Sequence, residues 1–260
     1  MNVSEQTYLM IIPLFTAHAL TDFVLQSEED VSRKHIPLVL FKHSFLAAIT
    51  SYIFVGSWRL WTIPVVILIS HCVIDYIKVK LSRDDLKIFL IDQLAHIIVI
   101  VAVSALFSPA NQSSITNCWE TLFGRLYYSS LVFISGAIIT VYAGGVVVGI
   151  IVEPYLNQIH EIRRESPSNS LLVNERLARG FENGGVVIGQ LERGLIFLLV
   201  LVNQPSAIGF LIAAKSVFRF GEIKEKSNRM EAEYILIGTL VSFLYGLIFS
   251  FLTREIIAWL

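Results

Sequence analysis

Residue types that bind metal ions recur at a fixed spacing in the first hundred residues of the chain. The three pairs, each four residues apart, are His18 with Asp22, His71 with Asp75, and Asp92 with His96. Residues four apart lie on the same face of a helix, so each pair can direct two ligands toward one point. His43, which lies between the first two pairs, is a seventh candidate ligand. The spacing therefore predicts a metal centre built by several helices.

The mixture of imidazole and carboxylate, without cysteine, is typical of sites for divalent transition metals, and zinc is the ion that we expect. A catalytic zinc ion needs about three protein ligands and an open position. Seven candidates are enough for two ions, or for one ion with additional carboxylates that orient the histidines. In a hydrolytic centre, one carboxylate that is not a ligand acts as general base, and Asp22 and Asp75 are the candidates. The structural alternative is that His–Asp hydrogen bonds hold the helices together without a metal.

The composition is that of an integral membrane protein. Of the 260 residues, 55% are hydrophobic and only 16% are charged, against about 25% charged residues in soluble domains. Mean hydropathy is +0.67. No basic patch suggests a nucleic-acid partner. The two cysteines, Cys72 and Cys118, form no CxxC motif, so we expect neither a cysteine-bound structural zinc nor a disulfide framework.

Apolar segments long enough to cross about 30 Å of hydrocarbon predict an all-α, polytopic membrane helix bundle of about eight transmembrane helices. They lie near 8–26, 37–56, 60–79, 87–108, 127–152, 185–203 and 234–253, with a shorter one near 205–220. Glycines at GxxxG-like spacing, among them Gly145 with Gly149 and Gly185 with Gly189, suggest close helix packing.

The distribution of basic residues predicts the orientation of these helices. Of the 20 Lys and Arg residues, 16 fall in alternate connections, which the positive-inside rule places in the cytoplasm. Both termini should therefore lie on the extracytoplasmic side of the inner (plasma) membrane. In this topology the seven candidate ligands lie at similar depth, toward the cytoplasmic ends of four neighbouring helices.

A polar external loop at 108–124 is the expected boundary between two units. The first, 1–110, is a four-helix unit that carries the His/Asp site. The second, 125–260, is a four-helix unit with a charged cytoplasmic loop at 153–184.

A second group of charged residues lies in the second unit. Its members are Glu192, Arg193, Lys215, Arg219, Glu222 and Glu231. One interpretation is a network of ion pairs between helices near the cytoplasmic interface, with the lysine and arginines reaching toward the headgroups. The other is a site for a phosphate-bearing headgroup or substrate, bound by the cations and oriented by the carboxylates.

Four short stretches carry a family resemblance: HALTDFVLQ (18–26), FKHS (41–44), SHCVIDYIK (70–78) and DQLAH (92–96). They resemble the bacterial and phage membrane family known as domain of unknown function 3307. The stretches GQLER, AAKS and IGTL of the second unit also resemble this family. More distantly, the histidine and aspartate pattern is similar to the LexA-regulated membrane-bound metal-dependent hydrolases. That second resemblance implies hydrolysis but identifies no substrate.

We therefore expect a metal-dependent membrane hydrolase that acts at the cytoplasmic side on an amphiphilic or phosphate-bearing substrate. One alternative is a transporter of divalent cations or protons, and a second is a non-enzymatic membrane sensor or anchor with a structural metal. Candidate partners are membrane lipid, a cytosolic protein that docks on 153–184, and a second copy of the chain.

Overall fold

The computed structural model describes residues 3–81, 85–107, 117–165, 183–220 and 229–260, and these are helical with short connections and without strands. The chain divides into two compact units. The first comprises Met1–Ile139 with Glu255–Leu260, and the second comprises Thr140–Arg254. The all-α prediction is confirmed for the described residues.

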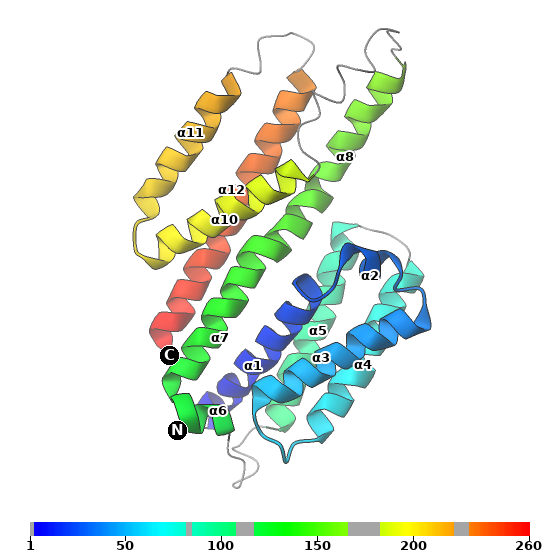
Figure 1. Cartoon of the computed structure of the whole chain (residues 1–260), viewed down its shortest axis with the longest axis vertical. Helices are drawn as coiled ribbons and strands as arrows, with labels where there is room; N and C mark the ends of the chain where they lie inside the picture. The colour runs from blue at the N-terminus through cyan, green and yellow to red at the C-terminus, as the bar shows by residue number, and fades with distance from the viewer. Residues whose placement is uncertain (1–2, 82–84, 108–116, 166–182, 221–228) are drawn as a thin grey trace. The chain divides into compact units, whose positions relative to one another are not determined.

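The first unit is a helix bundle around α1. Its helices are α1 (Val3–Phe23), α2 (Glu28–Ser32), α3 (Pro37–Val55), α4 (Thr62–Leu81), α5 (Leu86–Leu106), α6 (Cys118–Phe123) and α7 (Arg125–Ile138). Helix α1 packs against α3, α5 and α7, and α4 packs against α3 and α5 (Figure 1). Apolar residues of α1, α3, α4 and α5, including Leu14, Ile63 and Val103, form its core.

The second unit begins in a π-helical turn, η2 (Ile139–Ala143), which continues α7 into α8 (Gly144–Glu165). It then contains α10 (Gly184–Leu201), a 3₁₀ turn η3 (Pro205–Ala207), α11 (Ile208–Phe220) and most of α12 (Arg229–Trp259), whose residues from Glu255 onward belong to the first unit. Helices α10 and α11 form a hairpin through η3 (Figure 1). Ile196, Val200, Ile208 and Phe243 form the core where α10, α11 and α12 meet.

Among the described residues, six helices are long and apolar enough to cross a membrane, which indicates a multi-pass membrane protein. They lie at Pro37–Val55, Thr62–Leu81, Leu86–Leu106, Arg125–Glu161, Gly184–Leu201 and Ala232–Trp259. Two further predicted crossings correspond to shorter apolar helices, Leu9–Phe23 and Pro205–Lys215. The α11 helix has 13 residues and extends about 20 Å at 1.5 Å per residue, less than the hydrocarbon thickness.

The count of eight crossings and the extracytoplasmic position of both termini stay predictions, because two of the eight predicted helices, Leu9–Phe23 and Pro205–Lys215, are shorter than the other six. The compact units also divide the chain at a different point from the predicted units 1–110 and 125–260. Helix α7 belongs to the first unit because it packs on α1, where the Thr16 hydroxyl lies 3.2 Å from the Leu131 carbonyl oxygen and donates to it.

Gly56 ends α3 and fixes the start of α6. Its φ of +62° lies in the left-handed region, and its carbonyl accepts from the Cys118 amide at 3.0 Å. A Cβ atom at this position would lie 2.4 Å from Cδ1 of Trp119 and 2.6 Å from Oδ1 of Asn117. Neither side chain can easily move, since the Trp119 ring nitrogen donates to the Ile53 carbonyl and Asn117 Oδ1 caps α6.

Replacing Gly56 with alanine is therefore expected to lower the free energy of unfolding by about 2–3 kcal/mol, from left-handed strain and overpacking together. Gly149→Ala in α8 is the matched control, because a Cβ there meets no atom within 4 Å. Reversible unfolding in mixed micelles measures both. A Gly56 variant as stable as the Gly149 variant would contradict this account of the α3–α6 connection.

Candidate metal centre

The seven candidate ligands meet inside the first unit. His18 and Asp22 come from α1, His43 from α3, His71 and Asp75 from α4, and Asp92 and His96 from α5. The exposed fraction of the residue is 6% for His18, 5% for His43, 3% for His71, 0% for Asp75, and 4% for both Asp92 and His96. The Asp22 side chain is 8% exposed. Spacing of four on three helices has brought each pair to the interior face, as the sequence predicts.

The closest ligand atoms belong to Asp22, His43 and His71. The two Nε2 atoms of His43 and His71 are 3.0 Å apart. Asp22 Oδ1 lies 3.5 Å from Nε2 of His43 and 3.4 Å from Nε2 of His71. Asp75 Oδ2 lies near the same two imidazole nitrogens, 3.6 Å from Nε2 of His43 and 3.8 Å from Nε2 of His71.

These separations match the edges of a metal coordination sphere. A regular tetrahedron with edges of about 3.4 Å has its centre about 2.1 Å from each corner, which is the length of a zinc–nitrogen or zinc–oxygen bond. Asp22 Oδ1 is buried and has no hydrogen-bond partner among the described residues. The donor set therefore fits a divalent transition metal in both chemistry and spacing.

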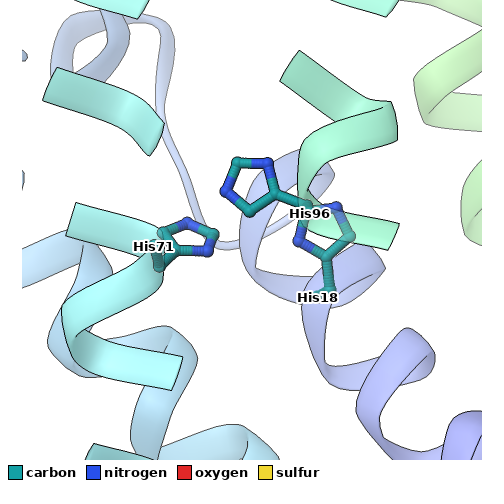
Figure 2. A group of neighbouring side chains, drawn as sticks. All are labelled: His18, His71 and His96. Atoms are coloured by element: carbon teal, nitrogen blue, oxygen red, sulfur yellow. The ribbon is translucent and has the colours of Figure 1, made fainter. Parts of the chain in front are cut away.

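A second group of potential ligands consists of Asp75, Asp92 and His96, which offer ligand atoms within 4.8 Å of one another. His18, His71 and His96 form a third such group. Figure 2 shows this third group: the rings from α1 and α5 stack, with centroids 4.8 Å apart, and the His71 ring approaches from α4, 4.4 Å from the ring of His96.

A cavity adjoins these three histidines. The other lining residues are Leu14, Ala47, Ser51, Ile67, Ser70, Val99 and Ile100. In α1 and α4 the lining residues precede the histidine and the aspartate follows it, whereas in α5 the aspartate precedes the histidine and the lining residues follow it. The cavity therefore lies on the opposite side of the histidines from the aspartates. Polar lining at Ser51 and Ser70 therefore continues into the part of the bundle that the predicted topology assigns to the outer leaflet.

Two lysines complete the centre, and the sequence prediction missed both. Lys34, 7% exposed, places Nζ 2.9 Å from Asp75 Oδ2, and Lys78 places Nζ 2.7 Å from Asp92 Oδ2. Lys78 follows His71 and Asp75 at the seventh and third positions, on the same helix face, so the periodicity did contain a signal for it. Lys34 lies in the connection after α2, where no periodic pattern marks it.

The second charged group divides into separate contacts. Lys215 Nζ pairs with Glu192 Oε2 at 2.6 Å. Arg193, 3% exposed, donates from Nε and Nη2 to the Val141 carbonyl at 3.0 and 2.8 Å, and from Nη1 to the Ser242 hydroxyl at 3.1 Å. Cβ atoms added to Gly144, Gly145 or Gly189 would lie 2.9–3.0 Å from Arg193 atoms.

These contacts give Glu192, Arg193 and Lys215 structural partners inside the second unit. Glu222 lies outside the described residues, and the side chains of Arg219 and Glu231 also lie outside them. Binding of a phosphate-bearing group by this set stays a prediction.

The comparison with known families adds one match. Residues 10–123 match the family described as protein of unknown function (DUF3307). No curated protein and no solved structure matches the chain. The matched segment contains all seven candidate ligands and both lysines, and the resemblance predicted from the four motifs is confirmed there. The resemblance predicted for the second unit, and that to the metal-dependent hydrolases, stay predictions. The segment that holds the candidate metal centre is thus the part of the chain that matches the DUF3307 family.

Proposed function

We propose that the protein is a metal-dependent hydrolase of the inner membrane that binds a divalent transition metal, with zinc as the expected ion, through Asp22, His43 and His71. The mutual distances of 3.0, 3.4 and 3.5 Å among these three ligand atoms carry the proposal. Three protein ligands leave a coordination position open, which is the arrangement of catalytic zinc sites.

The charges around the centre support a bound cation. With ordinary ionisation of the carboxyl and amino groups and neutral histidines, Asp22, Asp75 and Asp92 together with Lys34 and Lys78 leave one negative charge in the centre. An uncompensated charge in such a site is costly. A divalent ion offsets it and also satisfies the Asp22 oxygen that lacks a hydrogen bond.

The residues divide into ligands and one water-orienting group. Asp22 is assigned as a ligand rather than a base because Oδ1 lies nearest the two imidazole nitrogens. Asp75 lies slightly farther out and is held by Lys34, so it orients a water molecule and accepts its proton. A divalent ion supplies the acidity that lowers the pKa of water toward about 7 and polarises the scissile group. The substrate is an amphiphile, phosphate-bearing or not, that reaches the site from the membrane or the cytosol.

Metal analysis of the purified protein tests this proposal. Protein extracted in mild detergent without chelators should contain about one or two equivalents of a transition metal, and His43→Ala should lose at least one. His35→Ala is the control, because that histidine is exposed and its Nδ1 contacts only the Ser32 carbonyl among the described residues. Folded wild-type protein without metal, and unable to take it up, would overturn the proposal.

A second candidate function is transport of a divalent cation or of protons, favoured by the polar cavity lining at Ser51 and Ser70. Reconstituted vesicles separate the two functions. Release of product from phosphoester or carboxyl-ester amphiphiles without ion flux supports hydrolysis, whereas flux that requires His71 supports transport. The sensor alternative depends on 153–184, of which residues 166–182 lie outside the described part of the chain.

A further inference from the structure

We infer that the centre is binuclear: a second divalent ion is bound by Asp75, Asp92 and His96, beside the ion at Asp22, His43 and His71. The inference rests on the proposed function, because it takes the ion at Asp22, His43 and His71 as the first of the pair.

The second site is marked by three buried atoms that lack a hydrogen-bond partner among the described residues. They are Oδ1 of Asp75, Oδ1 of Asp92 and Nε2 of His96. Their residues are 0%, 4% and 4% exposed, and ligand atoms of the three lie within 4.8 Å of one another. Buried polar atoms almost always have a partner, so three such atoms, on residues whose ligand atoms come this close together, point to a bound cation.

The other polar side-chain atom of each of these three residues already has a partner. The atom without a partner is therefore the one left to bind a metal. Asp75 Oδ2 accepts from Lys34 at 2.9 Å, and Asp92 Oδ2 accepts from Lys78 at 2.7 Å. His96 Nδ1 lies 2.9 Å from the Asp92 carbonyl oxygen, and it can contact that acceptor only as an N–H donor. The neutral ring then carries its lone pair on Nε2, the atom available to a metal. Such outer contacts are typical of metal ligands.

Asp75 contributes to both sites through different oxygens. Oδ2 faces the first site, 3.6 Å from His43 Nε2 and 3.8 Å from His71 Nε2, whereas Oδ1 is the oxygen without a partner. Asp75 Oδ1 would then bind the second ion, while Oδ2, held by Lys34, keeps its role in orienting water beside the first. Two-metal sites are common in phosphatases and nucleases, which favours a phosphate-bearing substrate over a neutral one.

Reconstitution with Mn²⁺ tests the inference without any substrate. Wild-type protein stripped by a chelator should bind two equivalents and give the electron paramagnetic resonance spectrum of a spin-coupled pair. Asp92→Asn and His96→Gln should each bind one equivalent and give the spectrum of an isolated ion. Asp30→Asn is the matched control outside the centre and should retain two coupled ions.

The outcomes separate this inference from the proposed function. Binding of one equivalent by wild-type protein, lost in His43→Ala but unchanged in Asp92→Asn, would overturn the second site and leave the first. Two equivalents retained in both Asp92→Asn and His96→Gln would also overturn it. Binding of no ion would overturn both proposals. Melting temperatures of the metal-free variants identify any that do not fold, and either of the two second-site variants is sufficient for the comparison.

Discussion

Alanine in place of His71 is expected to lower the affinity for a divalent ion by roughly 100-fold or more, a larger effect than the 10- to 100-fold cost of losing an outer contact to a metal ligand. His71 offers a ligand atom to two of the three potential groups. Its Nε2 lies 3.0 Å from His43 Nε2 and 3.4 Å from Asp22 Oδ1, at the centre of the proposed first site. Competition against a fluorescent chelator measures the change in affinity.

The same variant should lose the stabilisation that a bound ion provides. At a free metal concentration of 100 times Kd, binding of one ion stabilises the folded state by about 2.7 kcal/mol, so added metal should raise the melting temperature of the wild type by more than that of His71→Ala. His35→Ala should respond like the wild type. Equal metal-induced shifts in the His71 and His35 variants would show that His71 binds no ion.

Substitution of Lys34 by methionine is expected to destabilise the folded protein by about 3–5 kcal/mol, the usual cost of removing one partner of a buried ion pair. The Lys34 and Asp75 side chains are only 8% and 1% exposed, with 2.9 Å between Nζ and Oδ2. Methionine preserves the length and apolar stem of lysine, so the loss reports mainly the uncompensated carboxylate. Equilibrium unfolding of the metal-free protein in mixed micelles gives the free energy.

Lys42→Met provides the matched control for this prediction. Lys42 pairs with Asp30 at 3.4 Å, but its side chain is 68% exposed, and exposed pairs contribute about 0–1 kcal/mol. The double variant Lys34→Met with Asp75→Asn should recover part of the lost stability, since it removes the unpaired charge. A Lys34 variant no less stable than the Lys42 variant would argue that Asp75 is protonated or that water reaches it.

The set of candidate ligands could be identified from the sequence because it depends on local geometry. Spacing of four residues fixes a common helix face wherever a helix forms, so each pair on α1, α4 and α5 could be identified before the helices were placed. The position of the candidate ligands along their helices was predicted less accurately. His71 lies ten residues from the end of α4 at Leu81, about 15 Å along the axis, so part of the centre lies near mid-helix rather than at the cytoplasmic end.

Partners across the fold could not be predicted in the same way. Lys34 reaches Asp75 from 41 positions away along the chain, and only tertiary packing decides that distance. Hydropathy likewise identified the span that begins with α7 but carried no information that α7 packs on α1. The length of α11 was also overestimated, because the apolar run from 205 includes the 3₁₀ turn η3 before the helix begins.

The glycines around Arg193 have a consequence for how this chain can vary. Their spacing resembles that of glycines that let two helix backbones approach, yet Cβ atoms at Gly144, Gly145 and Gly189 would each come within 3.0 Å of the Arg193 side chain. The three positions make room for a guanidinium that bonds to the π-turn carbonyl of Val141. A larger side chain at Gly145 or Gly189 requires the Arg193 side chain to shift or residue 193 to be smaller, whereas one at Gly144 would also meet the Tyr245 ring at 2.9 Å. Gly145 and Gly189 should therefore change together with residue 193, and Gly144 with both 193 and 245, in any chain that shares this arrangement.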